Sequence, residues 1–348
     1  MTDILSLSQT ELAAALSDTP KYTTAQLWQW LHEKRVRSFE ECTNLPKALR
    51  QKLEENFTFP NISIEHEYKS NIDKTLKYVY NCSEALIESA VLEYDTGLTA
   101  CISTQAGCKM GCVFCANSPE RFVRNLTTGE MLSQIYLLPA KVKHMVLMGI
   151  GEGLDNYDNV VRFIRTITDE KGYNLSARNI TLSTCGIVPK IDELSTEGLP
   201  ITLAISLHQT TDEARTRIMP INKRYNIKEV LDAAYRYFKK TGRRVSLEYA
   251  VAPGDNDTPQ DAKRLAELSR GFHINLIRLN PTGANSIGVN ATSVNKKEAP
   301  TAGANSTGAK KFKNRLESLG ASVTLRRTLG SDINAACGQL AVQAVKRV

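Results

Sequence analysis

Six short runs of apolar and β-branched residues, each followed by enough chain for a helix, constrain the fold of this sequence more than any other feature. The runs lie between residues 99 and 280 and read TACIST, HMVLMG, NITLST, ITLAISLH, RVSLEYAV and HINLIRLN. Strands that alternate with helices in this way form parallel βαβ units. The pattern therefore predicts an α/β fold, either a doubly wound sheet or a partial β/α barrel. In both folds, functional groups gather at the carboxyl ends of the strands.

The chain before residue 60 has apolar residues at helical spacing and no convincing strand. Its helical segments are SQTELAAALSD, TAQLWQWLHEKR and LPKALRQKLEENF, with Ser8, Thr23 and Asn44 as expected N-caps. The next segment, up to residue 98, alternates β-rich runs with turn residues, as an antiparallel hairpin does. We therefore predict three regions, namely a small helical domain (1–58), a short β-hairpin extension (59–98) and a core with a C-terminal tail (99–348).

The segment 281–310 is rich in Gly, Ala, Ser, Thr and Asn, contains the near-repeat TGANS/AGANS and has no aromatic residue. This composition predicts a long loop. After it we expect a helix in KKFKNRLESLG, a strand in ASVTLRR and a glycine-punctuated tail with a helical end, DINAACGQLAVQAVK.

The charge of the chain favours a polyanionic partner without requiring one, because 44 Lys and Arg residues stand against 37 Asp and Glu residues. Between residues 21 and 52, seven basic residues are interleaved with Trp28, Trp30 and Phe39. Such a segment either binds phosphates or is a solvated basic face above a core that contains the tryptophans. The sequence leaves both interpretations open.

Nothing in the sequence predicts a membrane location or export. No run approaches the roughly 18 apolar residues of a membrane span. The N-terminus MTDILSLSQTELAAALSDTP also lacks a basic segment followed by an apolar stretch. We therefore expect a cytoplasmic protein without membrane partners, and a monomer by default.

The strongest chemical motif is GCKMGCVFCA, which places Cys108, Cys112 and Cys115 directly after the first core strand. Cysteines in a long chain without a secretion signal indicate metal ligands or catalytic thiols rather than disulfides. Three thiolates can hold three irons of a four-iron cluster and leave the fourth iron open. A zinc site more often has four ligands, commonly as two pairs, so zinc and unliganded thiols are the less favoured alternatives.

A second motif, MVLMGIGEGLDN, follows the second core strand. Its glycines, Gly149, Gly151 and Gly153, allow backbone to approach a ligand, and Glu152 can accept hydrogen bonds from an amino group. Taken alone, the motif would more often be a tight strand-to-helix turn. Other residues that end core strands, and so belong to the expected site, are Ser183, Ser206, Leu207, His208 and Asn280.

The cysteine spacing, with Phe114 before the third cysteine, resembles the radical S-adenosylmethionine (SAM) superfamily. The resemblance implies a partial (β/α)6 barrel in which a [4Fe-4S] cluster is bound by Cys108, Cys112 and Cys115. SAM would bind the open iron through its amino and carboxylate groups, and electron transfer would cleave it to a 5′-deoxyadenosyl radical. The residues that this resemblance assigns to SAM are Gly151, Glu152, Ser183, Ser206, Leu207, His208 and Asn280.

Four further segments resemble the RlmN/Cfr family of RNA adenine methyltransferases, and the RlmN type in particular. They are TNLPKALRQKL, CISTQAGCKMGCVFCA with RNLTTGEML, SLHQTTDEARTRIMPINKRY and RRTLGSDINAACGQL. The resemblance runs from about Lys21 to Leu340. It implies methylation of carbon-2 of an adenosine in 23S rRNA, with tRNA as a second substrate. It also implies two SAM molecules for each methyl group and an electron donor of the flavodoxin type.

The same resemblance assigns three catalytic residues. Cys337 in AACGQL matches the cysteine that carries the methyl group, and Cys101 matches the thiol that later attacks the Cys337 sulfur. The attack would leave a transient Cys101–Cys337 disulfide that must be reduced. Glu88 matches the proton acceptor for carbon-2, with Glu93 as the fallback. The remaining thiols, expected to be ordinary, are Cys42, Cys82 and Cys185.

Two alternatives stay open, and two departures from the family pattern motivate the second of them. Gly153 stands where the family usually has proline, and the 281–310 segment is low in aromatic residues. One alternative is the related enzyme that methylates carbon-8 of the same rRNA adenosine and confers antibiotic resistance, which shares these cysteines. Another is an RNA-binding homologue with impaired catalysis.

Overall fold

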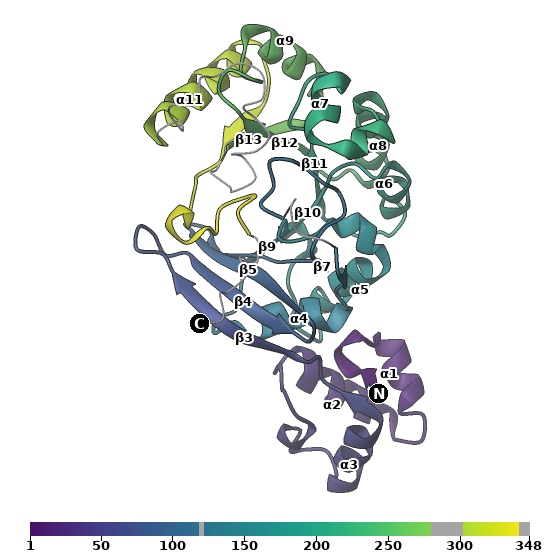
Figure 1. Cartoon of the computed structure of the whole chain (residues 1–348). Helices are drawn as coiled ribbons and strands as arrows, with labels where there is room; N and C mark the ends of the chain where they lie inside the picture. Colours follow the sequence, from purple (N-terminus) through teal and green to yellow (C-terminus); the bar gives the residue numbers. More distant parts are fainter. Residues whose placement is uncertain (118–121, 280–301, 341–348) are drawn as a thin grey trace.

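Figure 1 shows the computed structural model, which describes residues 1–117, 122–279 and 302–340. Within these residues, ten strands form one sheet in the order β14-β13-β12-β11-β10-β9-β6-β5-β4-β3. Helices cover the outer side of its later strands, and the N-terminal helices, in purple, form a separate group beyond β3 and α4 (Figure 1).

The six predicted core strands are confirmed, and they lie side by side in parallel. Strand β12 is buried on both faces, which is typical of parallel sheets, whereas β9, β10 and β13 alternate between buried and half-buried residues. The strand predicted in ASVTLRR, β14, is confirmed as a further parallel neighbour of β13. The bounds of the seven are β6 (Gly97–Cys101), β9 (His144–Leu147), β10 (Ile180–Thr184), β11 (Thr202–Ser206), β12 (Val245–Val251), β13 (His273–Arg278) and β14 (Val323–Leu325).

Helices connect consecutive parallel strands, as a partial β/α barrel requires. Helix α5 illustrates why they form: Tyr157, Val160, Val161 and Ile164 recur at helical spacing and are buried. The helices of the core are α4 (Thr128–Tyr136), α5 (Tyr157–Ile167), α6 (Val188–Leu194), α7 (Asp212–Ile218), α8 (Ile227–Thr241), α9 (Pro259–Leu268) and α11 (Ala302–Ser318), with short 3-10 turns η3 (Gly153–Asn156), η4 (Ala177–Asn179) and η5 (Pro220–Lys223).

The predicted hairpin extension is larger than expected and belongs to the core sheet. It has three antiparallel strands, β3 (Ile62–Lys69), β4 (Leu76–Cys82) and β5 (Ala85–Tyr94). Strand β5 also pairs with β6, so the extension continues the barrel sheet. The physical reason is that residues 87–91 of β5 are all buried, which requires protein on both faces.

The N-terminal helices are α1 (Gln9–Ala15), α2 (Lys21–His32) and α3 (Lys47–Asn56), with short turns η1 (Ile4–Ser6) and η2 (Phe39–Glu41). The expectation of no strand was wrong, because β1 (Thr2–Asp3) pairs with β2 (Phe57–Thr58). The three-region division at residues 58 and 98 stays a prediction.

The predicted N-cap of the first helix is confirmed: Ser8 accepts from the backbone N–H of Glu11 in a capping box. The other two caps were wrong. Helices α2 and α3 begin directly after Pro20 and Pro46, so Thr23 lies inside α2 and Asn44 lies before α3. Proline favours such helix starts because its fixed φ suits the turn and its missing N–H needs no partner there.

The aromatic residues of the basic N-terminal segment belong mainly to its core. Trp28 and Phe39 are buried, and the Trp28 indole N–H donates to Asp169 Oδ1 at 3.2 Å. Trp30 is half-buried, with the Lys34 ammonium 3.5 Å above its ring. For Trp28 and Phe39, the interpretation as a core below a basic face is therefore confirmed.

Two expectations near the C-terminus were wrong. Residues 302–310, predicted as loop, form the first half of α11, because Ala309, Phe312 and Leu316 bury one helical face. Residues 334–340 form turns rather than a helix, after the short turn η6 (Ser331–Ile333). The rest of both predictions, at 281–301 and 341–348, lies outside the described residues.

Candidate active site

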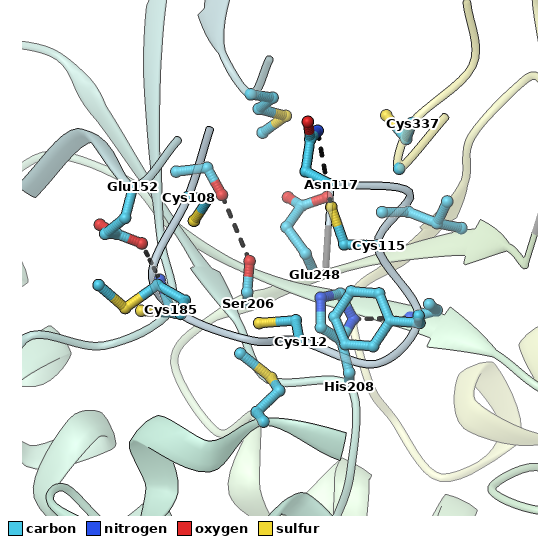
Figure 2. A pocket seen from close by; sticks show the side chains of 18 of the residues that line it. Cys108, Cys112, Cys115, Asn117, Glu152, Cys185, Ser206, His208, Glu248 and Cys337 are labelled. Carbon is cyan, nitrogen blue, oxygen red and sulfur yellow. Dashed lines mark hydrogen bonds between the residues drawn. The ribbon is translucent and has the colours of Figure 1, made fainter. Parts of the chain in front are cut away.

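One pocket opens at the carboxyl ends of the parallel strands (Figure 2). This is the place where a β/α barrel gathers functional groups from successive strand-to-helix loops. The pocket is also closed by residues of the C-terminal tail. Its polar and thiol lining consists of Cys108, Cys112, Cys115, Asn117, Glu152, Ser183, Thr184, Cys185, Ser206, His208, Glu248, Arg278, Arg326 and Cys337.

The three predicted cluster cysteines lie on one loop that lines this pocket (Figure 2). Strand β7 (Gln105–Ala106) pairs with β8 (Arg124–Asn125) and closes the base of the loop. The loop is attached to the barrel because Val113 N donates to the Ile218 carbonyl at 3.0 Å. These contacts hold the cysteines against the strand ends.

The thiol chemistry of the loop fits an iron–sulfur cluster. Burial raises the pKa of the Cys108 thiol to about 12 and raises the pKa of Cys112 as well, so without a metal both are protonated at neutral pH. Coordination to a metal replaces that proton. Within the described residues, no three His, Cys, Asp or Glu side chains are arranged around a single metal ion. In a cluster each thiolate binds its own iron, so three separate soft ligands on one wall are the relevant donor set.

Glu152 connects two strand ends beside the cysteine loop. Its Oε2 accepts from Cys185 N at 2.7 Å, and its Oε1 accepts from Leu154 N at 3.1 Å. Burial raises the pKa of this carboxyl group, and the backbone donors act in the opposite direction. Gly151 lies beside it with φ +109°, and a Cβ there would lie 2.7 Å from Gln105 Cβ. Glycine is therefore needed at this position for close packing against the protein as well as for access to the pocket.

Other predicted site residues are divided between the pocket and the core. Ser183 and Ser206 line the pocket with their hydroxyl oxygens 3.4 Å apart. Leu207 is fully buried and packs in the core cluster instead. Asn280 lies outside the described residues.

His208 presents a defined ring nitrogen to the pocket. Its backbone has φ 58°, and its Nδ1 accepts from Ala250 N at 3.0 Å. Burial lowers the pKa of the ring to about 3, so the imidazole is neutral and carries its proton on Nε2. The ring packs edge-on against Phe114, with centroids 4.7 Å apart.

Cys101 and Cys337, far apart in sequence, lie near each other, and Cys337 lines the pocket. Cys101 ends β6, and burial raises the pKa of its thiol to about 12, with the neighbouring Cys337 sulfur as the next cause. Cys101 also packs in a small apolar cluster with Ala335 and Leu340 of the tail. The tail therefore places Cys337 next to Cys101.

The tail is attached on both sides of Cys337. Upstream, the Asp332 carboxylate accepts from Ser70 Oγ at 2.7 Å and from Asn71 N at 2.8 Å. Downstream, Ala116 N donates to the Gly338 carbonyl at 2.9 Å. Cys337 is thus held between the β3–β4 turn and the cysteine loop.

The sheet register separates the two candidate proton acceptors. Cys101 lies opposite Ala90, and Glu88 is two residues from Ala90, so Glu88 and Cys101 share one face. Glu88 is buried there. Glu93 is on the alternate face, and its carboxylate pairs with Lys74 at 2.8 Å, with 42% of its side chain exposed.

Sequence reasoning missed a charge pair in the lining of the pocket, formed by the buried Glu248 and the half-buried Arg326. Glu248 accepts from Ser246 Oγ at 3.0 Å and Asn275 Nδ2 at 2.9 Å, and its other oxygen lies 3.5 Å from Arg326 Nη1. Cys337 is the main cause that raises the pKa of Arg326. The missed signal was a glutamate inside the otherwise apolar run RVSLEYAV, because buried carboxylates are rare without a partner.

Arg215 of α7 was also missed. It is fully buried and donates to the carbonyl oxygens of Cys185 at 2.6 Å, Ser206 at 3.0 Å and Leu207 at 3.2 Å. These are the carbonyls at the ends of β10 and β11. Arg215 therefore holds together the strand ends that line the pocket.

Comparison with known proteins defines the class first. Residues 102–268 match the Radical SAM superfamily. The crystal structure of a radical SAM methyltransferase from Sphaerobacter thermophilus superposes with a TM-score of 0.87 at 34% identity, covering 98% of this chain and 99% of that one. Together with the barrel and the cysteine loop, these matches define a radical SAM enzyme, which uses a [4Fe-4S] cluster and SAM.

The N-terminal region and the full-length relatives identify the family. Residues 2–59 match the ribosomal RNA large subunit methyltransferase N-terminal domain. A "Probable dual-specificity RNA methyltransferase RlmN" from Lachnospira eligens is 44% identical over 98% of this chain and 96% of its own length. A relative of the same name from Clostridium botulinum is 43% identical over 99% of this chain and 98% of its own. The chain belongs to the RlmN family of radical SAM RNA methyltransferases.

The expectation of no membrane span agrees with the helices of the structure. Over residues 1–117, 122–279 and 302–340, none of them combines the length and the hydrophobicity that crossing a bilayer requires.

Proposed function

We propose that this enzyme methylates carbon-2 of an adenosine in 23S rRNA, and of an adenosine in tRNA, with Cys337 as the methyl carrier. The observation that carries the proposal is the meeting of Cys337, Cys101 and Glu88 beside the loop of three cysteines. The name printed for the full-length relatives, a dual-specificity RNA methyltransferase, supports the choice of substrates.

Cys108, Cys112 and Cys115 are the residues that would hold the cluster. Glu152, Ser183, Ser206 and His208 line the same pocket and would contact SAM. When bound, the cluster and SAM supply the radical chemistry that removes a hydrogen atom from an unactivated methyl group.

The residues of the chain divide the remaining work. Cys337 Sγ accepts a methyl group from the first SAM and presents it to the base. Bonding of the methylene carbon to carbon-2 leaves one unpaired electron on the base, which would be returned to the cluster, and Glu88 takes the carbon-2 proton. The Cys101 thiol then gives up its proton as its sulfur attacks Cys337 Sγ, so that the sulfur–carbon bond breaks and a disulfide forms. The electron pair left on the exocyclic carbon takes a proton, and the Cys101–Cys337 disulfide must be reduced to two thiols before another turnover.

The raised pKa of Cys101 determines its protonation state before the disulfide forms. With a pKa of about 12, Cys101 is a thiol at neutral pH and not a premature nucleophile. Its proton must leave during the attack, when the bond to Cys337 Sγ forms. The buried position therefore keeps the Cys101 thiol protonated before the attack.

Three further features complete the proposal. The reductant would be a flavodoxin-type electron donor, the location would be the cytoplasm, where rRNA and tRNA are found, and the enzyme would act as a monomer. The carbon-8 reaction remains the second candidate function, because it needs the same thiols.

The test is a single-turnover reaction of the anaerobically reconstituted enzyme with methyl-labelled SAM and a 23S rRNA fragment. We expect wild type to form 2-methyladenosine, Cys337→Ala to transfer no label, and Cys101→Ala to accumulate a covalent protein–RNA adduct. Cys42→Ala is the matched control, because Cys42 is a buried free thiol of the N-terminal region.

The position of the label decides between the candidates. Label at carbon-8 would replace the proposed reaction with the resistance reaction, while the roles of both thiols would stand. A full cluster without any transfer to RNA would instead support an RNA-binding protein with impaired catalysis.

A further inference from the structure

A buried lysine lies beside the proposed proton acceptor. Lys77 Nζ is 3.4 Å from Glu88 Oε1, and the two side chains are 10% and 3% exposed. Lysine and glutamate are almost never buried unless they are paired. The contact is therefore a buried ion pair rather than a surface salt bridge.

The sheet register places this pair on the reactive face. Lys77 of β4 lies opposite Ala90 of β5, and Ala90 lies opposite Cys101 of β6. Side chains directly opposite each other in an antiparallel sheet point to the same face. Lys77 and Cys101 thus flank the same residue, and Glu88 is next to that row.

Burial works against a carboxylate that must act as a base. Desolvation disfavours the charged form, and a protonated carboxyl group cannot accept another proton. An ammonium group within hydrogen-bonding distance offsets this effect. The ring of Tyr68 on β3, 5.0 Å from Lys77 Nζ, further favours the cation at this place.

A second lysine–glutamate pair, between the β3–β4 turn and β5, allows a comparison. Lys74 Nζ and Glu93 Oε1 are 2.8 Å apart, but their side chains are 75% and 42% exposed. Exposed pairs of this kind contribute little to stability, because water screens both charges. The Lys77–Glu88 pair differs from it in burial and in its position next to Cys101.

We propose that Lys77 is a positioning residue that keeps Glu88 ionised, and that it acts only in the step in which carbon-2 loses its proton. The inference rests on the proposed function, in which Glu88 takes that proton. The proton moves from carbon-2 to a Glu88 oxygen, and Lys77 keeps its own protons throughout. Among the described residues, the other titratable groups on this face or in contact with it are His66, Tyr68, Tyr94, Cys101, His144, Arg326 and Cys337.

The experiment compares wild type with Lys77→Gln, Lys77→Arg and the control Lys74→Gln, all as full-length reconstituted enzymes. The first measurement is methylation of Cys337, by intact-protein mass, which needs neither Glu88 nor Lys77. The second is the rate at which the protein–RNA adduct resolves, followed across a series of pH values.

We expect all four proteins to methylate Cys337. The rate of adduct resolution should fall at low pH, where Glu88 becomes protonated; we call this part of the pH profile the acidic limb. In Lys77→Gln the acidic limb should move upward by about 1 to 3 pH units, because an adjacent opposite charge shifts the pKa of a carboxyl group by that amount. At pH values below the pKa of Glu88, each decrease of one pH unit should slow adduct resolution by about tenfold. Lys77→Arg should restore the wild-type limb, and Lys74→Gln should leave it unchanged.

A wild-type limb in Lys77→Gln would overturn the proposal and leave Lys77 with a structural role. If the glutamine variant fails to methylate Cys337, Lys77→Met provides the same test, because its unbranched chain suits the same buried space. Glu88→Gln separates the two levels of inference. If the adduct resolves at the wild-type rate in Glu88→Gln, Glu88 is not the base and the proposed function loses that step. If Glu88→Gln traps the adduct but Lys77→Gln keeps the wild-type pH dependence, only the role of Lys77 is excluded.

Discussion

At the scale of single residues, Gly153 is the most informative departure from the family motif. A Cβ at this position would lie 2.7 Å from Cδ1 of Leu182, which is fully buried in β10. Proline is otherwise suitable here, because residue 153 is the first residue of η3. The glycine is therefore matched to the leucine that packs below it.

We predict that Gly153→Pro alone destabilises the enzyme by about 1 to 3 kcal/mol through overpacking. Adding Leu182→Val should recover most of that loss, because it removes the methyl group that the new side chain meets. Urea unfolding of the two single variants and the double variant measures the coupling. Equal stability of Gly153→Pro and wild type would show that Leu182 moves aside without cost.

The sequence alone was sufficient to assign residues to the site where their chemistry requires a fixed spacing along the chain. Cys108, Cys112 and Cys115 could be assigned to one pocket because they lie on a single loop. Arg215 and Arg326 could not, because an arginine has no motif of its own and their partners are backbone carbonyls or distant thiols. Leu207 was misplaced because neighbouring residues at a strand end point to opposite faces.

At the scale of elements, the N-terminal segment is connected to helix α4 through a glycine. Gly129 N donates to Ser6 Oγ at 2.9 Å, and Thr127 Oγ1 donates to Asp3 Oδ2 at 3.2 Å. A Cβ on Gly129 would overlap the Asp3 carboxylate. Burial raises the pKa of Asp3, which is consistent with a carboxyl group enclosed by this contact.

We predict that Gly129→Ala loosens this connection although alanine is the better helix former by about 1 kcal/mol. The overlap with Asp3 should exceed that gain, so thermal stability falls and amide exchange in η1 and α1 becomes faster. In an Asp3→Gly background the same substitution should become stabilising. A stabilised Gly129→Ala in the wild-type background would contradict the proposed steric conflict.

The strands of the large sheet follow one another in chain order, with β7 and β8 set apart in a small sheet of their own. The parallel strands β9 to β13 pair in chain order, so periodicity and the βαβ rule predicted them correctly. Strand β6 was predicted too, but its second partner β5 was assigned to a separate hairpin. The error came from ALIESAVLEY, whose burial on both faces depends on the tail packing and not on local composition.

At the scale of the whole molecule, the site is completed by a segment from the end of the chain. Cys337 is held near Cys101 by contacts of the tail, among them Asp332 at the β3–β4 turn and Gly338 at the cysteine loop. Such long-range contacts leave no periodic signal in a sequence. The family resemblance predicted the pairing of the thiols, and the structure supplies the physical connection.

The N-terminal basic residues do not have equal access to a partner. Arg35 is half-buried and its Nη1 donates to the Leu138 carbonyl at 3.5 Å, so it contributes to packing against the core. Arg37 and Lys47 are exposed. A test of RNA contact therefore has to use Arg37 and Lys47, since a change at Arg35 would also disturb the fold.

We predict that Arg37→Gln with Lys47→Gln weakens RNA binding and reduces its dependence on salt. Each phosphate contact that is lost should lower the slope of log affinity against log salt by about 0.7 to 0.9, because fewer counterions are released on binding. Binding titrations of wild type and the double variant over a salt series measure this slope. Lys228→Gln is the control, because Lys228 is 84% exposed on α8 and pairs with Asp232. If the double variant keeps the wild-type slope, phosphates do not contact this face, and the positive charge of the N-terminal region serves only its solvation.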